Sequence, residues 1–227
     1  GAQGSVDILD LINPAAPVLL GTLTSADLGS GLGGANSIAI YNGIVAIAVE
    51  AAVKQDNGSV IFYRASDLTR LTAVTVGALP DMLTFTPDGS RIVVANEGEP
   101  NSYGQPTSVD PVGSISVISV PGLTPTATSI SPVVTAITFD SYNTQQDALR
   151  AAGVRLFGPG ATVAQDLEPE YVTISPDGRT AFVTLQENNA VAEVNLVNST
   201  LASIRALGTT DHSLSGAGMD VSNEDGS

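Results

Sequence analysis

The feature that most constrains this chain is a segment that occurs three times. Two copies are close, because residues 81–97 read DMLTFTPDGSRIVVANE and residues 170–187 read EYVTISPDGRTAFVTLQE. A weaker copy, NSIAIYNGIVAIAVE, covers residues 36–50. Each copy places an Asn-Gly or Asp-Gly pair between two apolar runs, which is the strongest short-range signal for a β-hairpin. The sequence therefore predicts one antiparallel unit that repeats along the chain.

Two further apolar runs follow each hairpin, and the first of them begins with Gly or Asn. Four strands per unit at a spacing of about 45 residues are typical of a β-propeller blade. We predict an all-β propeller fragment with about three full blades and a partial blade at each end. The predicted limits are a part-blade 1–30, blades 31–78, 79–139 and 167–208, and the start of a further blade at 209–227.

The second repeat is followed by an insertion, residues 140–166, which does not read as strand. Its residues 144–152 favour a short surface helix, since Thr144 and Asp147 have the spacing of a capping box and Gly153 suits the position after a helix end. The insertion is therefore predicted to add one helix to an otherwise all-β chain.

The charge balance excludes several classes of function. The 227 residues contain 8 Lys+Arg against 23 Asp+Glu, which gives a net charge of −15. Nucleic acid is excluded as a partner because no basic surface is present to meet the phosphates. No apolar run approaches the roughly 18 residues of a membrane span. With no Cys and a single His, thiolate chemistry and multi-histidine zinc sites are also excluded, and we predict no catalytic residue.

Carboxylates occur at equivalent places in the three repeats. The second strands end at Glu50, Glu97 and Glu187, while two of the first strands are entered at Asp81 and Glu170. In a propeller blade, both places lie at the same end of the sheet and near the central axis. We therefore predict a partial ring of carboxylates at the mouth of the channel.

A hard divalent cation would relieve the repulsion within such a ring, and Ca²⁺ tolerates irregular loop geometry. The alternative is that these loop acids are simply solvated. A second candidate Ca²⁺ loop runs from Asp220 to Asp225, although its spacing is not that of an EF-hand. The complete set of predicted metal ligands is Glu50, Asp81, Glu97, Glu170, Glu187, Asp220 and Asp225.

Longer motifs add a family resemblance. They include VANEGEPN at 94–101, RAAGVRLFGPG at 150–160, QDLEPEY at 165–171 and DHSLSGAGMD at 211–220. Together they resemble the choice-of-anchor I domain family, which is related to a mesenchyme-specific cell-surface glycoprotein and to bacterial proteins described as alkaline phosphatases. The resemblance implies a propeller-like module that is secreted or held at the cell surface, in proteins about twice as long as this chain.

The leading hypothesis is an extracellular or cell-surface module that binds an unidentified ligand or partner, with Ca²⁺ as its candidate cofactor. One alternative is a metal-dependent phosphatase or phosphodiesterase, in which loop carboxylates hold the ions. Another is a structural component of a surface layer or adhesin. Because edge strands cannot remain as open hydrogen-bonding ladders without risk, another fragment or chain is expected to supply the remaining blades.

Overall fold

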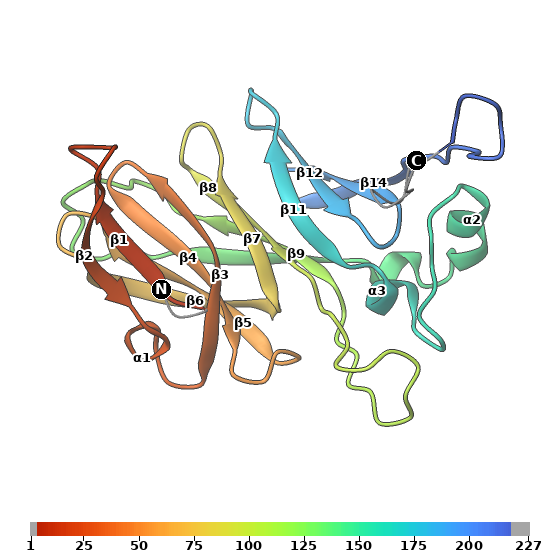
Figure 1. Cartoon of the computed structure of the whole chain (residues 1–227), viewed down its shortest axis with the longest axis horizontal. Helices are drawn as coiled ribbons and strands as arrows, with labels where there is room; N and C mark the ends of the chain where they lie inside the picture. Colours follow the sequence, from red (N-terminus) through yellow and green to blue (C-terminus); the bar gives the residue numbers. More distant parts are fainter. Residues whose placement is uncertain (1–3, 219–227) are drawn as a thin grey trace, which may run out of the picture.

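A computed structural model describes residues 4–218 as a row of antiparallel sheets (Figure 1). A two-stranded ribbon comes first and three four-stranded sheets follow in chain order. The ribbon is β1 (Val6–Asp10) and β2 (Val18–Leu23). The first blade is β3 (Leu32–Tyr41), β4 (Ile44–Ala51), β5 (Asn57–Arg64) and β6 (Thr69–Ala78). The second is β7 (Pro80–Phe85), β8 (Arg91–Asn96), β9 (Ser114–Ser119) and β10 (Val133–Thr138), and the third is β11 (Pro169–Ile174), β12 (Thr180–Leu185), β13 (Ala190–Asn195) and β14 (Thr200–Ala206).

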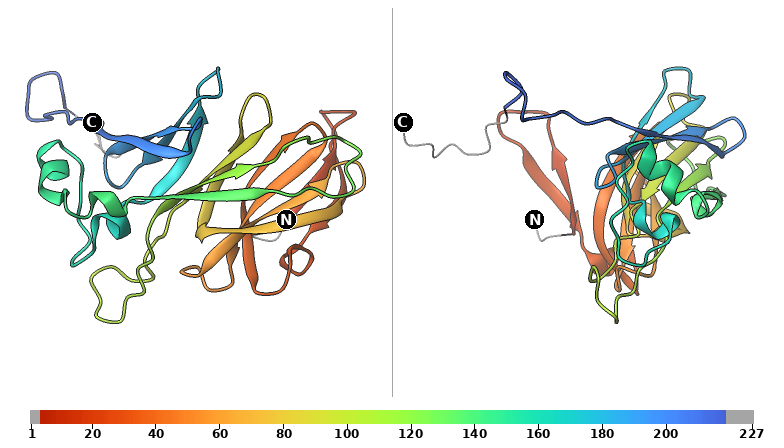
Figure 2. Two further views of the ribbon diagram at one scale, coloured as in Figure 1. Left: turned by 180° about the vertical axis from the view of Figure 1, so that it is seen from behind. Right: turned by 90° about the vertical axis from the view of Figure 1, so that its right-hand side faces the viewer.

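Strands that are consecutive in sequence pair side by side in every sheet, which is the meander of a propeller blade. The first strands β3, β7 and β11 lie on one side of the molecule, and β7 contacts both of the others (Figure 1). The fourth strands β6, β10 and β14 lie on the opposite side, which is nearest the viewer when the molecule is seen from behind (Figure 2, left). The prediction of an all-β propeller with four-stranded blades is therefore confirmed.

The repeated Asp-Gly pairs form the turns between the first and second strands. In the second blade, Gly89 N donates to the Thr86 carbonyl at 2.8 Å, and in the third, Gly178 N donates to Ser175 at 2.8 Å. Both glycines have φ near +70° (+68° and +70°), which side chains rarely adopt. Proline before each Asp presets φ at the second position of such a turn. The turn therefore follows directly from the repeated Pro-Asp-Gly sequence.

Apolar side chains fill the spaces between successive sheets, and each of the three core clusters occupies one such space. Phe62 and Ile92 lie in the cluster between the first and second blades, and Phe139 lies in the cluster between the second and third. Middle strands such as β4 and β8 are buried on both faces, so their runs are almost continuously apolar rather than alternating. Packing of the blades against each other thus produces the core.

The insertion contains η1 (Asp140–Tyr142), α2 (Gln146–Ala151) and α3 (Val163–Asp166), and a further short helix, α1 (Ser25–Leu28), precedes the first blade. The predicted helix is present, and Gly153 ends it with a φ of +97°. The predicted capping box was wrong, because the N-cap is Gln145 and no side chain caps it. A capping box instead begins α3, where Thr162 and Gln165 bond reciprocally. Within residues 4–218, no helix has the length and hydrophobicity needed to cross a bilayer.

Candidate functional site

Five of the predicted metal ligands lie at one end of the sheets, opposite the Asp-Gly turns. Asp81 and Glu170 are the second residues of β7 and β11, while Glu97 and Glu187 follow the ends of β8 and β12. Glu97 N donates to the Leu79 carbonyl at 2.9 Å, which holds the end of β8 beside the start of β7. We call this region the acidic end; it comprises Glu50, Asp81, Glu97, Glu99, Glu168, Glu170 and Glu187.

On the side of the first blade, the acidic end contains a cation. The Lys54 ammonium lies 3.6 Å from Glu50 Oε2. Both residues line an open pocket of about 550 Å³ together with Asn36 and Asp81. Burial raises the pKa of Asp81, and the charge of Lys54 opposes that rise. In this half, Lys54 therefore offsets part of the negative charge.

Between the second and third blades, the carboxylates face one another. Burial raises the pKa of Glu97 to about 8, and the charges of Glu99, Asp81, Glu168 and Glu187 contribute. The pKa of Glu170 also rises to about 8, through burial first and then through a hydrogen bond with Glu187. Glu187 Oε2 is buried and has no hydrogen-bond partner. At neutral pH Glu97 and Glu170 therefore hold protons that exposed glutamates would have lost.

Glu168 and Tyr103 belong to the same site, although neither is among the predicted metal ligands. Glu168 is 2% exposed, and the Tyr103 hydroxyl donates to its Oε1 at 2.7 Å. Burial raises the pKa of Glu168 to about 7, against the hydrogen bond from Tyr103, which lowers it. Glu168 is two residues before Glu170 at the entry to β11, so the spacing was a usable signal. Tyr103 comes from the long loop between β8 and β9, where no repeat equivalence could point to it.

The arrangement is suited to attracting positive charge. Within residues 4–218, no three acidic or histidine side chains are close enough to hold a metal ion together as they stand. The histidine lies elsewhere, exposed, with His212 Nδ1 2.6 Å from the Ala217 carbonyl oxygen. The predicted ligands Asp220 and Asp225 lie outside the described residues. The acidic end therefore offers negative charge and acceptor oxygens.

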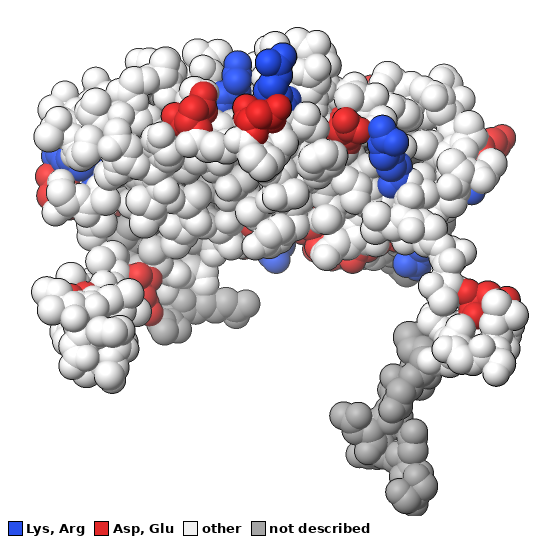
Figure 3. Space-filling model, turned by 90° about the horizontal axis from the view of Figure 1, so that it is seen from above, with Lys and Arg blue, Asp and Glu red and all other residues white. Residues whose placement is uncertain are grey.

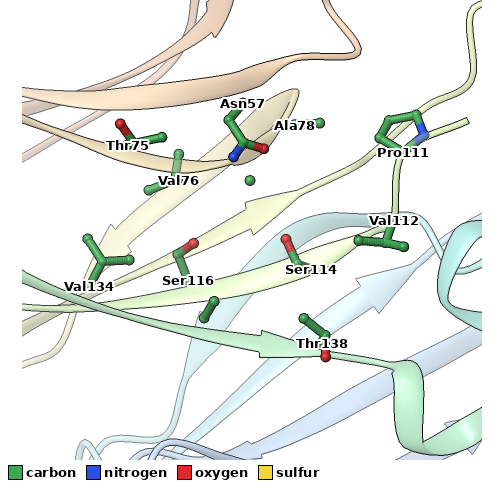
Figure 4. A pocket seen from close by; sticks show the side chains of 12 residues that line it. Asn57, Thr75, Val76, Ala78, Pro111, Val112, Ser114, Ser116, Val134 and Thr138 are labelled. Carbon is green, nitrogen blue, oxygen red and sulfur yellow. The ribbon is translucent and has the colours of Figure 1, made fainter. Parts of the chain in front are cut away.

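A separate groove of about 330 Å³ lies between β6 and the β9–β10 pair (Figure 4). The Ser114 and Ser116 hydroxyls extend from β9 toward β6, and the rest of the lining consists of small apolar, threonine and asparagine side chains. The lining contains no charged side chain. The groove is therefore chemically distinct from the acidic end.

Solved structures of similar shape include a β-propeller domain and proteins with unrelated functions. The similarity is therefore one of fold alone. The propeller domain of Myceliophteria thermophila Cps50 (Swd1) has a TM-score of 0.55 at 12% identity, over 90% of this chain and 54% of that one. Kuenenia stuttgartiensis hydrazine synthase gives 0.54 at 14% identity, over 89% and 56%. A putative 6-phosphogluconolactonase from Bacteroides uniformis gives 0.52 at 16%, over 91% and 53%. The chain thus spans about half the length of these relatives.

The family comparison covers nearly the whole chain. No curated protein matches the sequence. The family model of the choice-of-anchor I domain matches residues 2–227, which include all three blades and the insertion. The chain therefore belongs to the choice-of-anchor I domain family.

Proposed function

We propose that this chain is a propeller module displayed outside the cell, which binds a positively charged ligand at its acidic end. One observation carries the proposal. Glu97, Glu168, Glu170 and Glu187 are brought together from two blades, and none of them forms an ion pair with Lys or Arg within residues 4–218. The family membership supports a surface location.

Cation binding is expected because keeping these carboxylates ionised and close together costs free energy. Carboxylates that are partly removed from water repel each other, and protonation or a bound cation relieves that repulsion. A cation with oxygen ligands, of which Ca²⁺ is the simplest, would exchange for the protons that Glu97 and Glu170 retain. Binding should therefore strengthen as the pH rises through 8.

The two ends of the row of blades expose apolar side chains, and this suggests what kind of partner covers them. Apolar side chains are exposed on the ribbon, where Leu9, Ile12 and Leu19 are 49%, 92% and 57% exposed. At the other end of the row, Tyr171 and Phe182 are 62% and 39% exposed. Elsewhere in the chain, faces of this kind are covered by a neighbouring blade. We propose that further blades, from another fragment or chain, cover these faces and complete the acidic ring.

The test is calorimetric titration of the full chain with CaCl₂ and, separately, with a lysine decapeptide, at pH 5.5 and pH 8. We expect binding at pH 8 that is at least tenfold weaker at pH 5.5, because protons compete with the cation. The double variant Glu97→Gln, Glu170→Gln should bind at least tenfold more weakly than the wild type at pH 8. The exposed Asp147→Asn variant is the control for the change in net charge.

Two outcomes would contradict the proposal: no heat with either probe, or an affinity that the double variant leaves unchanged. The first outcome would favour the purely structural hypothesis. Hydrolysis of p-nitrophenyl phosphate with added Mg²⁺ or Ca²⁺, lost in the double variant, would favour the phosphatase hypothesis instead.

A further inference from the structure

Two segments that are distant in sequence pack together beside the acidic end. One is the loop between β8 and β9, residues 97–113, and the other is residues 156–168 of the insertion and its return to β11. Gly113 N donates to the Ala164 carbonyl at 2.9 Å, and Gln165 Nε2 donates to the Asp110 carbonyl at 2.8 Å. A Cβ on Gly113 would overlap the carbonyl of Leu167, so the two backbones are in close contact. The segments therefore form one unit.

A small pocket of about 50 Å³ lies between them. Its walls include Ser108 and Asp110 from the first segment and Gly158 from the second, and the Tyr103 ring forms another part. Asp166 lies against the Gly158 wall, since Gly158 N donates to Asp166 Oδ1 at 2.9 Å. A pocket of this size accommodates a small ion or one or two waters.

Two oxygen atoms of residues that line this pocket, Ser108 Oγ and Asp110 Oδ1, are buried and have no hydrogen-bond partner. The same holds for Oδ2 of Asp166, which lies behind the Gly158 wall. Asp166 as a whole is only 4% exposed, so water does not reach it freely. A buried carboxylate oxygen without a partner costs free energy that a ligand can recover. Asp110 and Asp166 both adjoin Gly158, which lines the pocket with Asp110 and donates its N–H to Asp166. Burial raises the pKa of both aspartates, while the Gly158 hydrogen bond and the charges of Arg150 and Arg155 oppose the rise at Asp166.

We propose that Asp110, Asp166 and Ser108 form a Ca²⁺ site that fastens the β8–β9 loop to the insertion. The two carboxylates balance the charge of one divalent ion. Ca²⁺ fits better than Mg²⁺, because it takes six to eight oxygens in irregular geometry and accepts hydroxyl, carbonyl and water ligands alongside carboxylates. Gly158 leaves room beside the site, where a Cβ would lie 3.1 Å from Asp166 Oδ1.

The site is separate from the acidic end, and its test distinguishes the two. The full chain is titrated with Ca²⁺ by calorimetry and with Tb³⁺ by luminescence excited through tyrosine, since Tyr103 lines the pocket. Asp110→Asn should weaken this binding at least tenfold, and Ser108→Ala should weaken it about threefold. The acidic-end variant Glu97→Gln, Glu170→Gln should retain the site, as should the exposed Asp147→Asn.

Hydrogen exchange supplies a second readout that a variant with a folding defect cannot mimic. In the wild-type chain, Ca²⁺ should slow amide exchange in residues 97–113 and 156–166, and leave β4 and β5 unchanged. The proposal is overturned if the wild type binds no Ca²⁺ at millimolar concentration. It is equally overturned if binding survives in both Asp110→Asn and Ser108→Ala, or if protection appears only at strands remote from the two segments.

Discussion

The two ends of the same blades shift the pKa of a carboxyl group in opposite directions. At the turn end, Asp88 accepts hydrogen bonds from Thr86 Oγ1 at 2.6 Å and from Ser90 N at 3.0 Å. These bonds lower its pKa to about 2. At the acidic end, eight residues beyond the Gly of that turn, burial and neighbouring carboxylates raise the pKa of Glu97 to about 8. One hairpin thus carries two carboxylates whose pKa values differ by several units.

The difference in pKa reflects the surroundings of the carboxylates at each end. At the turn end the carboxylates remain in water and receive local donors, and a view onto that end shows acidic side chains near Arg side chains (Figure 3). Asp177 repeats the pattern in the third blade, with Ser175 Oγ at 2.6 Å. Around Glu97 and Glu170 at the acidic end, burial and neighbouring carboxylates raise the pKa instead. A turn aspartate therefore stabilises the hairpin, while an acidic-end glutamate is repelled by neighbouring carboxylates, and a bound cation can relieve that repulsion.

The largest effect should come from the turn glycines. A Cβ on Gly89 would overlap the ring of Tyr41 from the first blade, whereas a Cβ on Gly178 would meet only Pro87 at 3.6 Å. Gly89→Ala should therefore lower the free energy of unfolding by about 3 kcal/mol. Gly178→Ala should lower it by about 1 kcal/mol, because only the positive φ is strained. Urea unfolding measures both, and equal losses would show that the contact with Tyr41 is unimportant.

The next effect concerns pH. Glu97, Glu168 and Glu170 have pKa values raised above those of the unfolded chain, so the folded chain retains protons that the unfolded chain releases. Their contribution to stability is fully present below about pH 4.5 and is lost as the pH rises through 7 to 8. After allowance for solvent screening, we expect a loss of about 2 kcal/mol between pH 5 and pH 9. Thermal unfolding in metal-free buffer measures this, and a flat profile would contradict the raised values.

A single substitution should remove part of that loss. Glu97→Gln keeps the shape of the side chain and eliminates a charge that burial disfavours. We expect a gain of about 1 kcal/mol at pH 8, discounted for partial exposure, and almost none at pH 5. The exposed Asp147→Asn, which changes net charge equally, should show no such gain. A stabilisation of the same size at both pH values would mean that packing, and not charge, is responsible.

The smallest effect should be seen at the turn end. Asp88→Asn retains one acceptor oxygen and weakens the bonds from Thr86 and Ser90, which should cost about 0.5 kcal/mol at pH 7. Because the pKa of Asp88 is lowered, the contribution of its charge is present above about pH 4 and is lost as the pH falls through 2. The difference between variant and wild type should therefore vanish near pH 2. Its persistence there would assign the cost to the amide group itself.

The candidate site was predictable to the extent that it repeats. Glu97 and Glu187 were found because they hold equivalent places in two copies, and strand pairing carries both to the same end. Tyr103 was not found, because its loop occurs only once and no local rule places it against the insertion. The capping box at Thr144 failed for a related reason, since spacing alone could not tell that the helix begins later, at Gln146.

By itself, the sequence determined the blade: short apolar runs, Pro-Asp-Gly turns and acids at fixed distances from them are all local properties of a hairpin. Only the tertiary structure decided which carboxylates are buried, which are paired, and which are left with unpartnered oxygens. The physical reason is that desolvation and charge repulsion depend on what covers a group. Here the cover for Glu168 and Asp166 comes from the β8–β9 loop and the insertion, segments that meet only when the second and third blades are packed together.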